Sequence, residues 1–469
     1  MIRSCRMAQL DWVKGAGKKA STTDCGKRIW TAALEAAGLS SESVAAEKDW
    51  RHDYAGAVVA LADAMMESPE VAVSAAQAGL DALYKEFVIG DVPLMDAMRA
   101  PVGAFKTATL ASHGGAKSVG VDVAELARLA QKGSVEWSAV FSCRAVVDGG
   151  GNLFMDEATR SRTLFVVLGG TAEMGPTKPL LSLGATVAAV CRGGQKWADL
   201  VEFAKTTDGA LLAPSSDGDV ATAGADVLAD APKIAAWIAS LAEDFDRVVI
   251  GSYIYLDGEA HVRACVACDA IATRAAELAG GKVALAYLVS PGTAYAVDAA
   301  TVADCDARYH AAPYWQRIAS GALRIGGGGY VPNARFGNIT NGLSVVQGPN
   351  YALAKTLQNW RCVVAHAAGV LVSANLAPPA RTASMVAKNA AVGRWLDGVQ
   401  KFEPYSTFEP HFASHVMAAL LVRDVERDTV KYAHPMLLLW DGAVHGGAPR
   451  CAFQGDSIAK SAVAASFFG

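Results

Sequence analysis

The chain has few charged residues, no long apolar run and no regular spacing of cysteines. Asp, Glu, Lys and Arg make up only 19% of its 469 residues, and the net charge is −4. Such a charge gives no general attraction to nucleic acid or to anionic membranes. No apolar run reaches the roughly 18 residues of a transmembrane helix, and residues 1–6 lack the apolar core of a secretory signal. We therefore expect neither a nucleic-acid partner nor a membrane span.

Disulfides and metal sites are also not indicated. The nine cysteines are odd in number and scattered, which fits reduced thiols in a cytosol, stroma or matrix. Cys265 and Cys268 form one C-x-x-C pair in an Ala-rich helical pattern, without a second pair at zinc-finger spacing. His411 and His415 share a helix face, but no third ligand follows them. We interpret the cysteine pair as core residues, predict no metal, and expect a cytoplasmic or organellar protein.

What the sequence does contain is a large apolar fraction and many tight turns. Hydrophobic residues make up 52% of the chain and 45 residues are glycine, which predicts a well-buried protein of two domains or one enlarged domain. Residues 1–160 have mainly helical spacing, apart from a strand-like run at 135–147. From residue 161 strands alternate with helices, which predicts an α/β fold with a doubly wound parallel sheet. We expect a Rossmann-like domain at 161–469 and a mainly helical N-terminal extension that packs on it or on a partner.

The first predicted strand of this domain ends in a glycine-rich turn. Residues 163–168 form an apolar run, a short helix follows at 177–183, and a second apolar run covers 185–190. Strand, glycine-rich turn, helix and strand make the unit that holds a dinucleotide pyrophosphate on backbone N–H groups. Glu173 stands where a further glycine is usual, so its carboxylate must point away from a pyrophosphate. A purely structural turn is the alternative. The candidate cofactor-binding residues of the turn are Gly169, Gly170, Thr171, Met174 and Gly175.

The residues after the second strand bear on the choice of cofactor. NAD normally meets an acidic residue there, on the ribose. This chain has Arg192 and, further on, Lys196 instead, which favours the phosphorylated cofactor NADP(H).

A Tyr-x-x-x-Lys pair lies later in the chain. Tyr351 and Lys355 are four residues apart on a predicted helix, so they share one face. An ammonium beside a phenol favours the phenolate and makes the phenol a better proton donor to a carbonyl oxygen that receives hydride. The same spacing also occurs by chance in many helices, so the pair gains weight from its flanks.

Three further strands flank this helix. Residues 283–289 form an apolar run that ends at Ser290. Residues 369–377 form another run, which stops at Pro378 and is followed by Thr382. Residues 435–442 have the content of a last strand ending in Asp-Gly.

In this order the features resemble the short-chain dehydrogenase/reductase superfamily, over residues 161–447 or about three-fifths of the chain. The resemblance implies that Tyr351 is the proton donor and that Lys355 holds the nicotinamide ribose and lowers the tyrosine pKa. It further places Pro378 and Thr382 at the cofactor, with Thr382 near the carboxamide. It implies NADP(H), a small carbonyl or alcohol substrate, and a homo-oligomer that pairs through the helix of Tyr351.

The sequence also departs from the family pattern. The family's catalytic serine usually precedes the tyrosine by thirteen residues, where this chain has Asn338, with Thr340 and Ser344 nearby. Ser290 is the other candidate, provided that an insertion at about 291–345 separates it from Tyr351, and we predict Ser290 as the third catalytic residue. Within the insertion, residues 309–335 have the irregular spacing of a substrate-side lid or a docking surface.

Two more departures keep other functions open. Residues 252–257 replace the family's Asn-Asn-Ala-Gly segment, and Cys265 stands where an Asn commonly assists proton relay. A non-catalytic reductase-like subunit of a larger assembly is therefore one alternative. Residues 285–288 look like the strand end of enoyl reductases, but those enzymes place their tyrosine seven residues before the lysine, which is Gly348 here. The spacing favours carbonyl reduction, with enoyl reduction as the second alternative.

Overall fold

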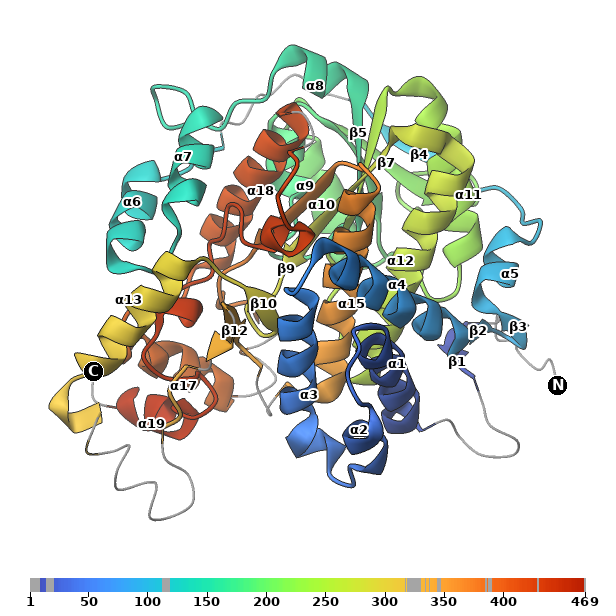
Figure 1. Cartoon of the computed structure of the whole chain (residues 1–469). Coiled ribbons are helices and arrows are strands. Elements are labelled where there is room, and N and C mark those ends of the chain that lie inside the picture. Colours follow the sequence, from blue (N-terminus) through green and yellow to red (C-terminus); the bar gives the residue numbers. More distant parts are fainter. Residues whose placement is uncertain are drawn as a thin grey trace.

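A seven-stranded sheet forms the centre of the molecule, in the order β13-β9-β8-β5-β6-β7-β4 (Figure 1). The computed structural model describes residues 9–13, 21–111, 119–316, 318, 330–333, 335–336, 338–343, 347–383, 386, 390–427 and 430–467. The strands of the sheet are β4 (Lys106–Leu110), β5 (Thr163–Leu168), β6 (Thr186–Val190), β7 (Ala210–Ser215), β8 (Arg247–Ser252), β9 (Val283–Val289) and β13 (Val372–Leu376). All neighbours are parallel except β4, which pairs antiparallel with β7.

The strand order creates a switch point in the middle of the sheet. From β5 the chain adds β6 and β7 on one side, and then returns to add β8, β9 and β13 on the other. Among the parallel strands this is the order 3-2-1-4-5-6 of doubly wound dinucleotide-binding sheets, in which ligands lie at the carboxyl edge beside the reversal. The predicted α/β class is confirmed as a mostly parallel, Rossmann-like sheet flanked by helices.

Helices bury both faces of the sheet. Along β5, Leu164, Val166 and Leu168 point into one core, whereas Phe165 and Val167 point into the other. A strand buried on both faces has a continuous apolar sequence, which is why β5 could be predicted. The first core contains residues of α11 (Ala231–Leu241), α12 (Glu259–Ala279) and α15 (Gly348–Ala367), and the second contains residues of α9 (Thr177–Ser182), α10 (Gln195–Ala204) and α18 (Pro410–Glu426).

The residues before β5 contribute to both cores and to the sheet itself. The helices on the first face are α1 (Thr22–Ala36), α2 (Glu42–Ala46), α3 (Trp50–Met65), α4 (Pro69–Lys85) and α5 (Leu94–Arg99). Strands β1 (Leu10–Trp12), β2 (Phe87–Ile89) and β3 (Val92–Pro93) form a small antiparallel sheet. Helices α6 (Val123–Lys132) and α7 (Trp137–Ala145) pack in the second core, and α8 (Glu157–Arg162) leads into β5. This region therefore carries strands as well as the expected helices, and β4 is an edge of the main sheet.

Helix α4 packs directly against α15. Figure 1 shows the N-terminal helices, coloured blue, beside α15. A Cβ atom on Gly79 would lie 2.4 Å from Cζ3 of Trp360, so only glycine fits there. Arg361 donates two 2.8 Å hydrogen bonds to Asp269 of α12, and Tyr84 of α4 donates one to the same carboxylate at 2.5 Å. The N-terminal helices thus cover the outer face of the α12–α15 pair.

The residues between β9 and α15, and those after β13, build the remaining part of the molecule. They contain β10 (Ala294–Ala296), α13 (Ala299–His310), β11 (Arg335–Phe336), β12 (Ile339–Asn341), α17 (Ala390–Gly398) and α19 (Ala459–Ala465). Short 3-10 helices are η1 (Ala242–Asp244), η2 (Gly280–Lys282), η3 (Val399–Lys401), η4 (Pro435–Leu439) and η5 (Ala448–Arg450). Strands β10, β12 and β11 form a sheet of their own. Much of the expected lid at 309–335 lies outside the described residues.

Two predicted strands are wrong. Residues 135–147 contain α7, and residues 435–442 begin with the 3-10 helix η4. Short apolar runs cannot be assigned to strand or helix by periodicity alone. In α7 the buried residues Ala139, Val140 and Cys143 follow helical spacing, and in η4 Pro435 starts the turn while His434 Nδ1 accepts a hydrogen bond from the Met436 N–H.

The structure also bears on the expectations about membrane spans and cysteines. Across the described ranges, no helix combines the length and the apolar character that crossing a bilayer requires. The described cysteines, which include the buried Cys265 and Cys268, are all free thiols.

Candidate functional site

The predicted site residues gather at the carboxyl edge of the parallel strands. The glycine-rich turn follows β5, Arg192 follows β6, Ser290 follows β9 and Pro378 follows β13. Because parallel strands end at the same edge, these segments surround the switch point between β5 and β8. Helix α15, which connects the insertion to β13, carries Tyr351 and Lys355 in its first two turns.

Ser290 and Tyr351 are hydrogen-bonded. Ser290 Oγ lies 2.7 Å from Tyr351 Oη, and the same Oγ accepts a 3.0 Å hydrogen bond from the Gly292 N–H. Ser290 occupies this place because β9 ends one residue earlier and the chain turns sharply at Gly292. The rival position, Asn338, stands in a turn before β12 with φ 74°, Thr340 lies within β12, and Ser344 lies outside the described residues.

Burial governs the phenol of Tyr351. It raises the pKa of Tyr351 to about 12, against the smaller lowering effect of hydrogen bonds with Ser290 and Gln347. Lys355 Nζ stands 6.0 Å from the centroid of the Tyr351 ring. The expected lowering of the phenol pKa by Lys355 is therefore not what this arrangement produces, because desolvation outweighs the effects that favour the phenolate.

Lys355 is itself partly buried and held by a neighbour that the sequence analysis did not single out. Its Nζ donates to Gln358 Oε1 at 3.2 Å. Burial lowers the pKa of the Lys355 ammonium, and the thiols of Cys265 and Cys268 oppose this effect. Gln358 lies three residues further along the helix, a spacing at which side chains meet. A polar residue within an apolar helix pattern was the only feature of the sequence that could have pointed to this contact.

Two aromatic rings contact Tyr351, His261 by stacking and Tyr255 edge-on at 6.4 Å. His261 is 1% exposed, and its ring lies 5.6 Å from that of Tyr351 with an interplanar angle of 22°. Tyr255 is 48% exposed and packs against His261 at 5.1 Å. Burial, with the Lys355 cation nearby, lowers the pKa of His261 well below its usual value, so the imidazole is neutral and its Nδ1 can accept from the Leu256 N–H at 3.4 Å. Tyr255 and Leu256 belong to the segment 252–257 that replaces Asn-Asn-Ala-Gly, whereas His261 lies in the first turn of α12.

The glycines of the turn after β5 are required by packing. Gly169 has φ 97°, and a Cβ atom on it would lie 2.8 Å from Ile254 Cγ1. A Cβ on Gly170 would lie 2.7 Å from Cβ of Ala189 in β6. At Gly175 a Cβ would lie 3.1 Å from the Ala172 carbonyl oxygen, a tighter contact than usual. The turn is thus tightly fitted between β6 and the segment after β8, as a dinucleotide turn must be, although packing alone would account for the glycines.

The other residues of the turn face different neighbours. Thr171 hydrogen-bonds the thiol of Cys191, and Met174 packs against the second core. Glu173 accepts a 3.0 Å hydrogen bond from the Ala383 N–H, so its carboxylate reaches across to the segment that carries Thr382. The short helix α9 starts after Pro176 and contains Pro179, and proline supplies no N–H for an anion.

The remaining candidates lie at the same edge of the sheet. Arg192 is exposed just beyond the end of β6. Pro378 is buried and Thr382 half-buried in the segment after β13, where the Thr382 N–H donates to the Ala380 carbonyl oxygen at 2.9 Å.

A large cleft lies away from these residues. A cleft of about 1030 Å³ is lined by α6, the turn at 148–151 and the residues before and at the start of α18, including His411 and His415. A much smaller cavity near Met174 and Asn375 has a volume of about 10 Å³. Neither is lined by Tyr351 or Lys355. Within the described part of the chain, no group of three or more potential metal ligands occurs, and His415 Nδ1 instead contacts the Gly120 carbonyl oxygen at 3.1 Å.

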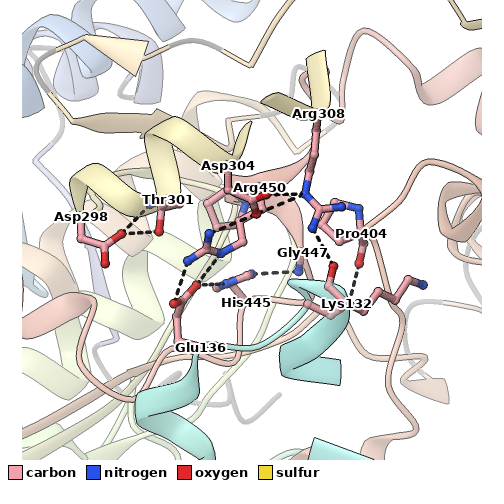
Figure 2. Close-up of polar contacts among 12 residues, drawn as sticks. Lys132, Glu136, Asp298, Thr301, Asp304, Arg308, Pro404, His445, Gly447 and Arg450 are labelled. Atoms are coloured by element: carbon pink, nitrogen blue, oxygen red, sulfur yellow. Dashed lines mark hydrogen bonds and ion pairs between the residues drawn. The ribbon is translucent and has the colours of Figure 1, made fainter. Parts of the chain in front are cut away.

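A second polar cluster lies away from the switch point, where α7, α13 and the C-terminal segment meet (Figure 2). His445 Nδ1 accepts from the Gly447 N–H at 2.8 Å, so Nε2 carries the proton that it shares with Glu136 at 3.0 Å. Burial raises the pKa of Glu136, but hydrogen bonds from His445 and Arg450 outweigh this effect and lower it to about 2. Arg450 also pairs with Asp304 of α13 at 3.1 Å. The cluster therefore joins three distant segments.

Comparison with known proteins adds no family to this description. No protein-family model matches the chain, and no curated protein matches its sequence significantly.

Proposed function

We propose that the protein is an NADP(H)-dependent reductase of the short-chain dehydrogenase/reductase type, acting on a small carbonyl or alcohol substrate. The observation that carries this proposal is the 2.7 Å contact between Ser290 and Tyr351 at the carboxyl edge of the sheet. Lys355 lies one turn further along the same helix face, with its Nζ 6.0 Å from the Tyr351 ring. Ser290, which is 61 residues before Tyr351, thus meets the Tyr351–Lys355 pair of one helix near the carboxyl edge of a Rossmann-like sheet.

The chemical roles follow from the side chains. Tyr351 Oη would donate its proton to the substrate carbonyl oxygen, and Ser290 would orient the phenol through their hydrogen bond. The Lys355 ammonium would offset the negative charge that develops on the phenolate. The nicotinamide, when bound, supplies the hydride. Burial keeps Tyr351 protonated at neutral pH, which is the state that a proton donor needs.

Parts of the site fit a phosphorylated dinucleotide. The exposed Arg192 guanidinium is a suitable partner for a 2′-phosphate, and Gly169 lets the turn approach a ligand closely. Pro378 and Thr382 would contact the nicotinamide half from the segment after β13. Glu173 opposes binding, because its carboxylate lies between the turn and that segment, and a dinucleotide would have to displace its contact with Ala383.

A binding assay followed by a turnover assay tests this proposal. We expect NADPH to bind more tightly than NADH when each is titrated by fluorescence. Replacing Tyr351 by Phe should reduce turnover by about 10²–10⁴-fold, the range for a lost general acid, and should change NADPH affinity little. Phe141→Leu, at an aromatic residue of α7 that is 59% exposed and lies outside the predicted lid, is the control. Unchanged turnover in Tyr351→Phe, or no binding of either cofactor, would remove the proposal.

A non-catalytic reductase-like subunit is the second candidate. The Glu173 contact with Ala383 and the prolines at the start of α9 favour it, because both reduce the donors available to a pyrophosphate. Absence of NADPH and NADH binding would support this candidate. The enoyl reductase alternative has less support, since Tyr287 is only 5% exposed within β9 and Gly348 offers no phenol.

The helical N-terminal region also enters this proposal. We infer that residues 1–160 act as an extension of the reductase domain, with α4 in the position that a partner subunit would need on α15. Gly79 against Trp360 and Tyr84 against Asp269 support this role. A homo-oligomer would then pair through another surface. Cross-linking of the protein with mass spectrometry tests this, because intermolecular links at α12 or α15 would contradict it.

A further inference from the structure

Gln358 holds the charged end of Lys355 in a fixed place. Its Oε1 accepts a 3.2 Å hydrogen bond from Lys355 Nζ. On the other side, its Nε2 donates to Ser252 Oγ at 3.3 Å and lies 3.6 Å from Cys265 Sγ. Gln358 is only 2% exposed, so solvent does not compete for these contacts.

The partners determine which way the amide faces. Lys355 has three donors and no acceptor, so the amide oxygen must face the ammonium. The amide nitrogen then faces a hydroxyl and a thiol, both of which can accept. Turning the amide over would place its N–H₂ group against the ammonium and lose the contact at 3.2 Å. The amide oxygen thus has a donor as its partner and the amide nitrogen has two acceptors.

Ser252, the last residue in this series of contacts, belongs to the central sheet. It is the last residue of β8 and pairs in register with Leu168 of β5, directly at the switch point. The amide therefore connects the ammonium on α15 to the most central part of the sheet.

We propose that Gln358 is a positioning residue, which fixes Lys355 beside Tyr351 by linking its ammonium to the carboxyl end of β8. This inference rests on the proposed function for its catalytic meaning, whereas the contact between Gln358 and Lys355 can be tested without any cofactor. An amide oxygen holds the ammonium without neutralising it, so the positive charge stays available to a phenolate or a ribose hydroxyl.

The other groups around the ammonium do not provide this support. On α12 these are His261, which is neutral, and the thiols of Cys265 and Cys268. Burial raises the pKa of Cys265 to about 11 and that of Cys268 still higher, so both thiols are protonated at neutral pH. On α15 itself Tyr351 is also protonated. None of these four described groups carries a negative charge that could hold Lys355.

Titration of Lys355 tests the contact directly. Lysine labelled with ¹³C at Cε would be incorporated, and the Lys355 signal assigned by its loss in Lys355→Met. Gln358→Met keeps the length of the side chain but removes the acceptor, so the pKa of Lys355 should fall. Gln358→Glu places an anion there and should raise it. Asn359→Leu removes the neighbouring buried amide, whose Oδ1 has no hydrogen-bond partner, and should leave the Lys355 pKa unchanged.

A second readout connects the contact with the cofactor. We expect Gln358→Met to weaken NADPH binding about tenfold, the loss that corresponds to one hydrogen bond to a charged group. Gln358→Glu should recover most of this affinity. A folded Gln358→Met variant with an unchanged Lys355 titration would overturn the positioning role. If the unmodified protein binds no NADPH, the proposed function fails, and the lysine titration still decides the role of Gln358 by itself.

Discussion

At the scale of single residues, burial and hydrogen bonding have opposite effects on the Tyr351 phenol. Burial disfavours its phenolate, the Ser290 hydrogen bond favours it, and the neutral ring of His261 stacks on its face. The net effect is a phenol with a pKa of about 12, held in one orientation. Such a phenol stays protonated at neutral pH, and a further positive charge nearby would increase its acidity.

Ser290 provides the first residue-scale prediction. Replacing Ser290 by Ala removes the hydrogen bond that lowers the Tyr351 pKa, so the phenol becomes a weaker acid and loses its orientation. We expect kcat to fall about 10–100-fold, for the loss of one hydrogen bond that strengthens in the transition state. NADPH affinity should stay within about threefold. Steady-state kinetics of Ser290→Ala would show this, and Ser161→Ala, at an exposed serine of α8, serves as control. A kcat equal to that of the control would contradict the role of Ser290.

Arg192 provides the second residue-scale prediction. Replacing Arg192 by Ala removes the exposed cation at the end of β6, so NADPH should lose affinity while NADH should not. We expect the preference for NADPH to decrease about tenfold or more, as for a lost charge-assisted contact to phosphate. Dissociation constants for both cofactors, measured in parallel with the exposed-site variant Arg162→Ala, would test it. An unchanged ratio of the two constants would show that Arg192 is not the selecting residue.

At the scale of elements, the sequence predicted several strands of the main sheet. The runs that became β5, β6 and β9 are buried on both faces, and such strands are continuously apolar. Strand β7 was not predicted, because its six residues include a proline and end in serine. The last predicted strand at 435–442 failed because an apolar run of that length suits a 3-10 turn equally well.

In the candidate site, some residues could be predicted from local spacing, whereas others depend on contacts between distant segments. Tyr351 and Lys355 follow from local spacing on one helix. The choice of Ser290 over Asn338 required the path of the insertion, which brings the end of β9 against α15. Gln358 and His261 could not be predicted, because their contacts join α15 with β8 and α12 across about a hundred residues of sequence.

The contact between α4 and α15 provides an element-scale prediction. Gly79→Ala places a methyl group against the buried Trp360, and such overpacking costs about 1–3 kcal/mol of unfolding free energy. Gly56→Ala on α3 is the matched control, because its Cβ would meet nothing within 4 Å and alanine favours a helix by about 1 kcal/mol. Urea unfolding should therefore give opposite signs for the two variants. Equal stabilisation of both would mean that α4 does not pack tightly on α15.

At the scale of the whole molecule, the cluster in Figure 2 joins segments that are more than a hundred residues apart. Glu136 starts α7, Asp304 belongs to α13, and His445 and Arg450 belong to the C-terminal segment. His445 also stacks on Trp440 with a ring separation of 5.3 Å and an angle of 4°. The cluster thus ties the residues after β9 and after β13 to the N-terminal part of the chain.

This cluster makes stability depend on pH. The pKa of Glu136 is lowered from 4.5 to about 2 in the folded protein, so its contribution is complete above about pH 4.5 and is lost as the pH falls towards 2. At pH 7, Glu136→Gln should lower the unfolding free energy by roughly 3 kcal/mol. The difference from the unmodified protein should shrink at pH 3. Urea unfolding at both pH values tests this, and a difference that does not change with pH would exclude the carboxylate as its source.

The most direct measurement of the central claim is a crystal structure of the protein with NADP⁺. We expect the dinucleotide along the carboxyl edge of β5 and β8, with the Glu173 contact to Ala383 opened, and with the nicotinamide ring beside Tyr351 and its ribose on Lys355. NADP⁺ bound away from Tyr351, for instance in the cleft next to α6, or no NADP⁺ bound at saturating concentration, would contradict the assignment of Tyr351 as the proton donor.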